Sequence, residues 1–375
     1  MDLKDLLKRY PHIRVAKESD NDLIIDFYKK LNDKSLPQSK LHFHNDDFFK
    51  FIRERSKDYL VFILENSKKD IEGISIISYR DGFIDGKSTI VGYLGDLRLI
   101  SAKDSDIEWH KFFAEFMKYS EYMDETFCCK YYQVALKTSS DLDIKGIKFS
   151  PLVQYEMVNI IGVVLKLISA SRFKVTRATS EDKEDIVRFL EKDHKKRNFG
   201  LHYPEEFERR LETWENFDIS NWIICRRKKE IVAITYTWNP RDSKAYTVST
   251  VPRIEKVKLK ILKYTPLIRL SKIPKDNSIL NILYLGQITF TNDYSNFKKQ
   301  RILKAFLRFL FMKNQKFTSL AYCNFQVEDL FQRTPGIFYE KSPMTLYSVH
   351  YHEDDCIKYP ISPTGKAPAF DLAYL

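Results

Sequence analysis

The sequence contains little glycine and proline, few cysteines and no long apolar run, and each shortage excludes a class of protein. With 11 Gly and 13 Pro among 375 residues, the chain is neither collagen-like nor a low-complexity segment. Its five cysteines include no C-x-x-C pair of the kind that binds zinc or performs redox chemistry. We therefore interpret the cysteines as buried free thiols in a reducing compartment, and we predict no metal site.

No apolar run is long enough to cross a bilayer. The longest, around Val158–Ile168, is interrupted by Lys166 and is shorter than the roughly 20 residues that a membrane-spanning helix needs. The opening residues, Met1–Asp5, are charged and do not show the pattern of a secretory leader. These observations predict a cytoplasmic protein.

The chain does contain enough apolar material for a large core, together with an excess of positive charge. Its 375 residues correspond to about two domains of ordinary size, and 43% of them are hydrophobic. The formal net charge of +11 favours anionic partners such as phosphorylated cofactors, nucleic acid or acidic lipid. The basic run Arg226–Lys229 lies between two apolar stretches, where a solvated hairpin turn is the simpler interpretation.

The sequence repeats itself with an offset of about 160 residues. The opening Ile13–Ala16, followed by a helix signal after Asp20, returns as Val175–Ala178, followed by a helix signal after Asp182. Later segments match as well: Leu41–Phe43 with Leu201–Tyr203, the hairpin Tyr59–Glu65 and Ile71–Tyr79 with Asn221–Arg226 and Ile231–Trp238, and Tyr93-Leu94-Gly95-Asp96 with Tyr284-Leu285-Gly286-Gln287. The pattern predicts two copies of one structural unit.

The second copy carries about thirty additional residues before its Tyr-Leu-Gly strand, from Tyr246 to Asn277. Four lysines alternate there with apolar residues: Lys256, Lys258, Lys260 and Lys263. The pattern fits a basic amphipathic segment at an anionic membrane or nucleic acid, or an extended surface connection, which we favour because the segment is short. We expect no nucleic-acid partner, and peripheral contact with an anionic membrane stays open.

Each copy reads as a strand, two helices, two or three antiparallel strands, the Tyr-Leu-Gly strand, another helix and a final strand. The helix after the Tyr-Leu-Gly strand is predicted at Ile107–Tyr122 in the first copy and at Lys298–Met312 in the second. Both have an apolar, aromatic face that is typical of a core. The sequence therefore predicts an α+β protein in which each copy is a mixed, mostly antiparallel twisted sheet flanked by helices.

This order of elements, with the opening Ile13–Ala16 and the central Tyr93–Leu99, resembles the GCN5-related N-acetyltransferase (GNAT) superfamily, and in particular tandem-GNAT proteins. The resemblance implies an N-terminal domain at 1–170 and a C-terminal domain at 171–375 with an insert near 246–277. In this family acetyl-CoA or a longer acyl-CoA lies in a V-shaped gap between the fourth and fifth strands. A glycine-rich turn at the start of the following helix holds its pyrophosphate.

Neither copy has glycines in that turn. In the first copy the turn falls on Asp104–Trp109 and carries three carboxylates that repel an anion: Asp104, Asp106 and Glu108. In the second copy the turn falls on Ser295–Gln300 and is basic. The candidates for binding the phosphates are therefore Lys298, Lys299 and Arg301. The resemblance adds Gly286 and Gln287, on the fourth strand, as contacts of the pantetheine arm.

The catalytic groups that the resemblance implies are divided between the copies. Asp96 is placed to act as the base beside the fourth strand of the first copy, whereas the second copy has Gln287, which cannot serve as a base. Phe331 stands where the family often has a tyrosine general acid, and a phenyl ring cannot donate a proton. Phe331 is also explained as a core residue that packs the last helix against the sheet.

The repeated histidines His42 and His202 stand just before the second helix of each copy, near where substrates enter this fold. They are candidate substrate contacts, although capping or packing is the simpler role. Two functions remain open. The chain is an acyl-CoA-dependent N-acyltransferase with a small-molecule or other amine acceptor, or a catalytically inactive GNAT-fold protein that binds a ligand or partner.

Overall fold

We describe the fold from a computed structural model of the chain. The described residues are 2–34, 41–44, 46–100, 103–123, 127–137, 144–168, 173–248, 250, 261–262, 264–291, 294–313, 316–332, 334–351, 357–358, 361 and 365–372. Within these ranges no helix is both long enough and apolar enough to span a membrane.

The elements follow the predicted order in both halves. The first half contains α1 (Leu3–Arg9), β1 (Ile13–Val15), α2 (Asn21–Lys34), β2 (Leu41–His44), α3 (Phe48–Arg55), β3 (Asp58–Glu65), β4 (Ile71–Ile84), β5 (Lys87–Leu99), α4 (Lys103–Tyr119), β6 (Tyr131–Lys137) and β7 (Lys148–Val164). The second contains β8 (Lys174–Arg177), α5 (Lys183–His194), β9 (Gly200–Leu201), α6 (Tyr203–Thr213), β10 (Trp222–Arg227), β11 (Glu230–Trp238), β12 (Ala245–Val248), β13 (Ile268–Leu270), β14 (Ser278–Ile279), β15 (Ile282–Leu285), β16 (Thr289–Phe290), α8 (Asn296–Lys313), β17 (Ser319–Phe325) and β18 (Ile337–His350).

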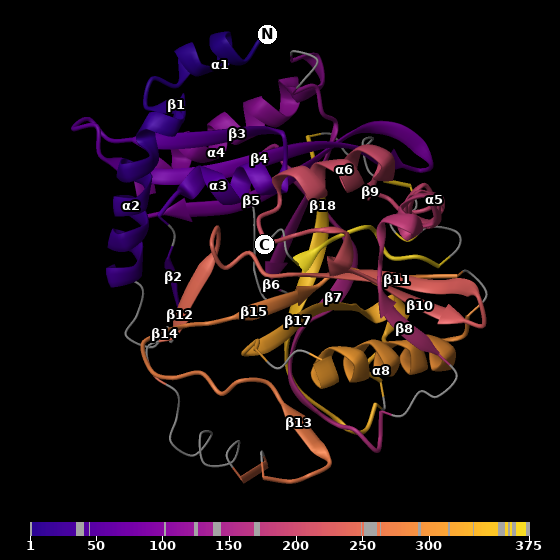
Figure 1. The fold of residues 1–375 in the computed structure, drawn as a ribbon. Coiled ribbons are helices and arrows are strands. Elements are labelled where there is room, and N and C mark those ends of the chain that lie inside the picture. The colour runs from indigo at the N-terminus through magenta and orange to yellow at the C-terminus, as the bar shows by residue number, and fades with distance from the viewer. Residues whose placement is uncertain are drawn as a thin grey trace.

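One large mixed sheet runs through the whole molecule, in the order β1-β3-β4-β5-β6-β18-β7-β17-β15-β11-β10-β8 (Figure 1). Shorter strands extend it, because β9 pairs with β4, β13 with β7 and β16 with β11. Neighbouring strands are mostly antiparallel, but β5 pairs with β6, and β15 with β17, in parallel. The predicted α+β class with a mixed, mostly antiparallel sheet is confirmed.

The long final strands β7 and β18 join the two halves. They pair antiparallel from Ile337 opposite Val163 to His350 opposite Lys148. On their outer edges, β18 pairs with β6 of the first half and β7 pairs with β17 of the second half. Each half therefore receives its last strand from the other, and the two halves share one sheet.

A capped helix follows the first strand of each half, as the repeat predicts. Asp20 accepts a hydrogen bond from the backbone N–H of Lys17 at 2.7 Å, and Asp182 accepts one from Thr179 at 2.9 Å. Each carboxylate is also bound by a guanidinium group, from Arg14 and from Arg226 respectively. A carboxylate at this position satisfies backbone donors at the start of a helix and interacts favourably with its dipole.

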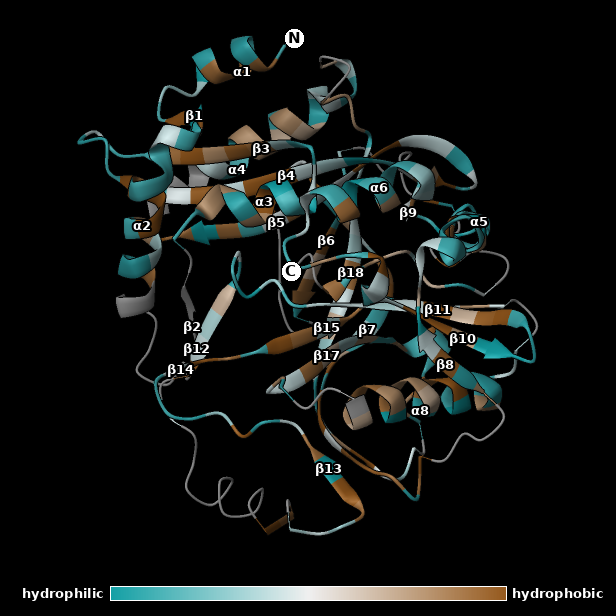
Figure 2. Ribbon diagram, in the orientation of Figure 1, coloured by the Kyte–Doolittle hydropathy of each residue, from teal (hydrophilic) through white to brown (hydrophobic). Residues whose placement is uncertain are grey.

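The core lies on both faces of the sheet. The aromatic face of α4 is buried in the first half, and the apolar face of α8 is buried in the second half. A further cluster between the halves contains Phe51, Tyr93, Trp222, Tyr236 and Phe370. Figure 2 shows the apolar residues concentrated on the sheet strands, while α5 at the periphery is largely polar. The predicted core faces of both helices are confirmed.

Part of the insert forms strands. β12 pairs with β2 of the first half and with β14, and β13 adds to β7. This part of the insert therefore connects the second half to the first through backbone hydrogen bonds. The predicted basic segment with Lys256, Lys258, Lys260 and Lys263 lies outside the described residues.

Candidate functional site

The parallel strand pair of each half opens partway along its length. In the first half, β5 and β6 pair only from Val91 opposite Tyr131 to Tyr93 opposite Gln133, although both strands continue. In the second half, the last β15–β17 pair is Tyr284 opposite Ala321, and β17 continues to Phe325. These pairings place Tyr93 and Tyr284 at equivalent positions, as the repeated Tyr-Leu-Gly motif predicts.

Irregular backbone follows each opening. In the first half the register of β4 against β5 shifts between Ile74 and Ile76, and Asp96 has a positive φ of 49°. In the second half the backbone N–H of Gly286 donates to the Tyr236 carbonyl at 3.0 Å. A Cβ atom at Gly286 would lie 2.3 Å from the Tyr236 ring, so only glycine fits this close approach. Gly286 therefore has a packing role independent of any ligand.

A small cavity lies beside the second opening. It is partly open to solvent, and the roughly 360 Å³ of empty space around it includes that open part. Its walls come from both halves of the chain and from the segment near residue 370. They are formed by Arg80, Gln133, His194, Phe199, Leu201, Tyr203, Arg210, Tyr236, Gln287, Ala369, Phe370 and Asp371.

Positive charge predominates around the cavity. Arg210 donates from Nε to Glu206 at 2.6 Å, and the same carboxylate binds Arg209 at 2.9 Å. Burial alone would raise the pKa of Glu206, but the charges of Arg209 and Arg210 outweigh it and hold that pKa well below its usual range. Arg80 adds a third guanidinium group, while Asp371 supplies the second carboxylate.

His194 and Tyr203 add groups that are neutral at physiological pH. Burial lowers the pKa of His194 well below its ordinary value, and the charges of Arg197 and Arg210 lower it further. Its Nδ1 accepts the backbone N–H of Leu201 at 3.0 Å, so the neutral ring carries its proton on Nε2. Burial raises the pKa of Tyr203 to about 12. In this tautomer His194 can donate a hydrogen bond from Nε2.

Buried polar atoms at the cavity wall include Oε1 of Gln133 and the hydroxyl oxygen of Tyr236, neither of which has a hydrogen-bond partner within the described part of the chain. Their residues are only 4% and 2% exposed. Leaving such a group unsatisfied costs on the order of 1–3 kcal/mol. Orphaned groups that face a cavity are therefore natural contacts for a polar ligand.

The segment Lys366–Leu372 closes one side of the cavity. Gln287 donates from Nε2 to the Pro368 carbonyl at 3.5 Å and accepts the backbone N–H of Phe370 at 3.4 Å. The Phe370 ring packs against Tyr93 at 6.0 Å and against Tyr155 at 5.4 Å between centroids. The side chain of Gln287, predicted as a cofactor contact, therefore positions this segment.

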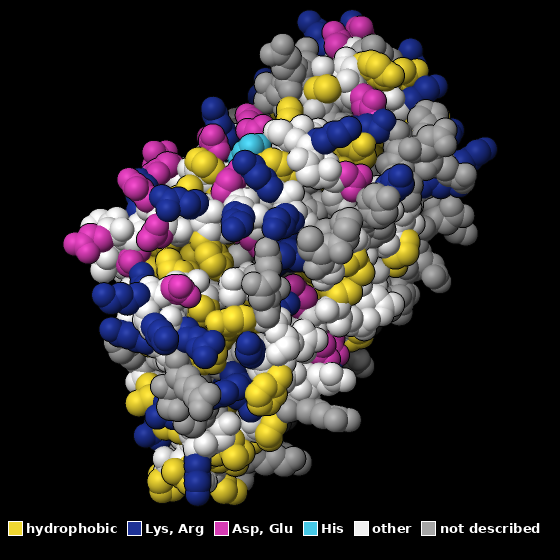
Figure 3. Space-filling model, turned by 90° about the vertical axis from the view of Figure 1, so that its right-hand side faces the viewer, with side chains coloured by type: hydrophobic (Ala, Val, Ile, Leu, Met, Phe, Trp, Pro, Cys, Tyr) yellow, Lys and Arg dark blue, Asp and Glu magenta, His cyan; other side chains and the backbone are white. Residues whose placement is uncertain are grey.

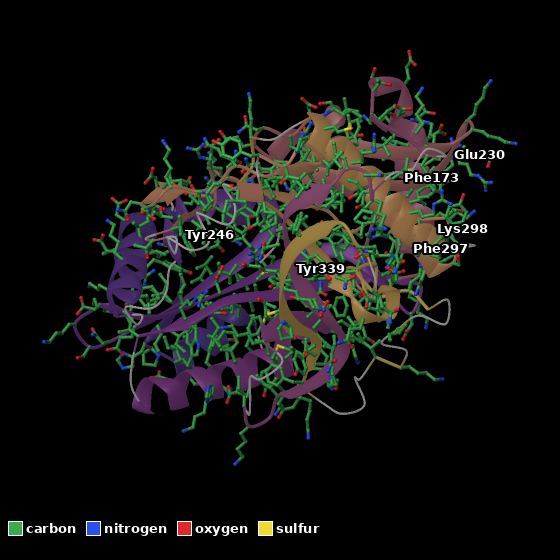
Figure 4. The ribbon with its side chains drawn as sticks, turned by 90° about the horizontal axis from the view of Figure 1, so that it is seen from below. Phe173, Glu230, Tyr246, Phe297, Lys298 and Tyr339 are labelled. Atoms are coloured by element: carbon green, nitrogen blue, oxygen red, sulfur yellow. The ribbon has the colours of Figure 1, made fainter. Side chains whose placement is uncertain are left out.

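The predicted phosphate-binding residues lie on the first turns of α8. Nζ of Lys298 lies 5.0 Å from the centre of the Tyr294 ring, whereas Lys299 pairs with Glu328 at 3.4 Å. In Figure 4, Lys298 and Phe297 lie at the same edge of the molecule as Phe173 and Glu230. Figure 3 shows many Lys and Arg side chains on the face of the molecule that lies at the right in Figure 1. Arg227, Lys228 and Lys229, in the turn between β10 and β11, are exposed.

Asp96, the predicted base of the first half, lies in a different group of charges. Its Oδ1 is 3.7 Å from Arg98, and its charge also acts on Arg55 and Lys244. Arg55 is 1% exposed, and within the described residues its Nε and Nη1 have no hydrogen-bond partner. Arg55 and Lys244 both lie over the Phe51 ring, at 5.0 and 4.6 Å. Asp96 is not among the residues that line the cavity.

The structure places the remaining predicted residues as follows. His202 precedes α6, packs its ring on Phe83 at 4.3 Å and contacts Ser88 through Nε2 at 2.9 Å. His42 lies on β2, opposite Thr247 of β12. Phe331 is buried between Tyr322 and Tyr339, in a turn rather than on the predicted last helix.

Sequence reasoning missed the residues that give the cavity its chemistry. Arg80, Gln133, Arg210 and Asp371 match no motif, and they come together only because β4, β6, α6 and the segment near residue 370 meet in space. The charge of Arg80 and Arg210 was visible in the sequence. Their convergence was not, because it depends on how the two halves pack together.

Comparison with known proteins identifies the fold but no sequence family. No protein-family model and no curated protein sequence matches the chain. Its structure is similar to that of Saccharomyces cerevisiae N-myristoyltransferase with bound myristoyl-CoA, with a TM-score of 0.59 and 9% identity over 96% of this chain and 85% of that one.

A second similar structure is a GCN5-related glucosamine N-acetyltransferase region of a fungal multi-domain β-N-acetylglucosaminidase. Its TM-score is 0.57, with 11% identity over 90% of this chain and 38% of that one. Together with the two opened strand pairs, these similarities show that the chain has the fold shared by GCN5-related N-acetyltransferases and N-myristoyltransferase.

Proposed function

We propose that this protein transfers an acyl group from acyl-CoA to an amine. The observation that carries the proposal is the cavity beside the second opened strand pair, where a thioester held in the gap would meet an acceptor. The N-myristoyltransferase that shares the fold is described with bound myristoyl-CoA. The length of the acyl chain used here is left to experiment.

The cavity offers a group for the proton transfer that amide formation requires. The acceptor nitrogen attacks the thioester carbonyl, a C–N bond forms, the C–S bond breaks and CoA leaves as the thiolate. Asp371 lines the cavity and can take the proton that the amine loses, a role that Gln287 cannot fill. Asp96 stays the candidate base for the first half, which has its own opened strand pair.

The alternative, a binding protein without catalysis, is favoured by the turn before α8. This turn has no glycine, and Lys299 is already paired with Glu328. Phe331, at the position of the general acid, is buried in the core. Neither feature prevents transfer, because thiolate release also proceeds by protonation from solvent.

Calorimetric titration with acetyl-CoA and longer acyl-CoAs, followed by a thiol-release assay with amines, tests the proposal. We expect acyl-CoA binding and amine-dependent release of CoA that falls about 10²- to 10⁴-fold in Asp371→Asn. Asp70→Asn, in the exposed turn after β3, is the matched control. Binding without amine-dependent release would support the non-catalytic alternative, and absence of binding would rule out both uses of acyl-CoA.

The phosphate contacts can be tested separately. Replacing both Lys298 and Arg301 by Glu should weaken acyl-CoA binding by about 10- to 100-fold, because charge-assisted hydrogen bonds are lost and repulsion replaces them. Lys299 is left intact because it pairs with Glu328. The double variant Lys4→Glu and Lys68→Glu has the same charge change at exposed sites of the first half. Equal affinity in both double variants would place the phosphates elsewhere.

A further inference from the structure

A group of apolar side chains is exposed around β13, at the lower end of the molecule in Figure 1. Ile261 is 66% exposed, Tyr264 87%, Leu267 51% and Leu167 50%. We call these four residues the apolar patch. Single exposed apolar residues are common, but several on contacting segments mark a surface that binds another molecule.

Backbone hydrogen bonds hold the two segments of the apolar patch side by side. β13 pairs with the end of β7, and the backbone N–H of Leu165 donates to the Leu267 carbonyl at 2.8 Å. Leu267 therefore lies beside the turn that carries Leu167. On the other segment, the backbone N–H of Tyr264 donates to the Ile261 carbonyl at 3.2 Å, so these two residues share one turn. The apolar patch is thus a fixed feature of the fold.

Basic side chains accompany the apolar patch on the same segments. Lys166 and Lys272 are exposed, the first in the turn after β7 and the second just after β13. Nη1 of Arg269 donates to a backbone carbonyl of its own turn at 3.1 Å, and Nη1 of Arg308, on α8, donates to the Leu165 carbonyl at 3.2 Å. These acceptors are uncharged, and in the described part of the chain none of the four cations forms an ion pair. Their positive charge therefore stays available to an anionic partner.

The three stretches of sequence that contribute these residues contain no carboxylate. No Asp or Glu occurs between Glu156 and Glu181, between Glu255 and Asp276, or between Asp293 and Glu328. The neighbouring strand β18 has its first carboxylate at Glu340, opposite Asn159 and five residues before the last residue of β7. At about 3.3 Å per residue this is roughly 16 Å along the strand, more than the Debye length in physiological salt. Figure 3 shows hydrophobic and basic side chains mixed at this lower end of the molecule.

We propose that the apolar patch docks the protein on the surface of an anionic membrane. The lysines and arginines bind the negative headgroups, and the four apolar side chains enter the boundary between headgroups and acyl chains. A nucleic acid is also a polyanion, but it stacks on aromatic side chains, whereas three of the four exposed side chains are aliphatic. Docking of this kind does not depend on the proposed acyl transfer.

Sedimentation of the full chain with lipid vesicles tests the proposal. The vesicles contain equal parts of phosphatidylglycerol and phosphatidylcholine, or phosphatidylcholine alone. We expect the protein to bind the mixed vesicles at least tenfold more tightly than the neutral ones. This preference should shrink as salt is added, because salt screens the attraction between the basic side chains and the headgroups. Equal binding to both kinds of vesicle, or binding to neither, would overturn the proposal.

A double variant tests the contribution of charge. Lys166→Glu with Lys272→Glu should weaken binding to the mixed vesicles about tenfold or more, because two attractive charges become repulsive. The control is Lys4→Glu with Lys68→Glu, which makes the same charge change at exposed sites of the first half and should bind like the wild type.

A second double variant tests the contribution of the apolar side chains. Tyr264→Ser with Leu267→Ser should weaken binding about tenfold or more, because less apolar area enters the membrane. Tyr122→Ser with Leu23→Ser removes the same two types of side chain, 73% and 54% exposed, from the first half and should leave binding unchanged. Patch variants that bind as tightly as their controls would show that this surface is not the one in contact with the membrane.

Two other results would overturn the proposal by assigning a different occupant. The first is a single-stranded oligonucleotide that binds more tightly than the mixed vesicles and is unaffected by Tyr264→Ser with Leu267→Ser, which would point to a nucleic acid. The second is self-association that the same double variant abolishes, in a protein that binds no vesicles, which would identify the apolar patch as an interface between two copies of the chain.

Discussion

Lys244→Met should make the protein more stable than the wild type at pH 6, and this advantage should disappear as the pH rises toward 10. Lys244 is 8% exposed, and its ammonium lies among Phe51, Tyr246 and two arginines. Burial lowers the pKa of Lys244 to about 7, the charge of Asp96 opposes that effect, and the charge of Arg55 adds to it. Burying an ammonium group costs folding free energy, whereas burying the uncharged methionine side chain does not.

The direction of the pH dependence follows from proton binding. Between pH 7 and the ordinary lysine pKa of 10.5, the unfolded chain holds a proton on Lys244 that the folded protein has released. Wild-type stability therefore rises through this range and is lowest below pH 7. At about 1.4 kcal/mol per pKa unit, the change in the difference between wild type and variant is on the order of 3–5 kcal/mol.

Chemical denaturation at several pH values measures this difference. Subtracting the Lys244→Met curve from the wild-type curve removes the contributions of other lysines and tyrosines, which both proteins share. Lys68→Met, at an exposed lysine in the turn after β3, should show no such difference. A stability difference between the two proteins that is constant from pH 6 to pH 10 would mean that Lys244 stays charged in the folded protein.

Asp193→Asn should cost about 3–5 kcal/mol of folding free energy, because it removes the partner of two buried cations. Asp193 binds Arg197 at 2.5 Å and also binds Lys366. Arg197 lies 3.9 Å from Glu328, which in turn pairs with Lys299 of α8. This chain of ion pairs connects α5, α8 and the segment Lys366–Leu372.

The same substitution should loosen the wall of the cavity. Nη1 of Arg197 donates to the Ala367 carbonyl at 2.9 Å, and Asp193 binds Lys366. We therefore expect the bond after Lys366 to resist trypsin in the wild type. We expect faster cleavage at that bond in Asp193→Asn, measured by mass spectrometry, together with a lower denaturation midpoint.

Asp185→Asn is the matched control on the same helix. Asp185 is exposed and lies 3.5 Å from Arg188, a surface pair that contributes at most about 1 kcal/mol. Equal destabilisation by the two substitutions would show that the buried chain does not hold the segment in place.

Much of the fold could be predicted from the sequence because the evidence for it is local and repeated. Alternating and helical apolar patterns predicted the hairpins β3–β4 and β10–β11 and the helices α4 and α8, and the Tyr-Leu-Gly motif predicted the equivalence of β5 and β15. The exchange of β7 and β18 could not be predicted, because each strand has the same pattern whichever half it pairs with.

The candidate site, like the fold, was predicted only in part from the sequence. The sequence by itself determined the α+β repeat, the two opened strand pairs that the resemblance implies, and the basic first turn of α8. Only the tertiary structure brought Arg80, Gln133, Arg210 and Asp371 to one cavity and placed Lys244 beside Asp96. These residues are far apart in the sequence and share no spacing, so their proximity depends on how the two halves pack against each other. Local patterns along the chain carry no information about that packing.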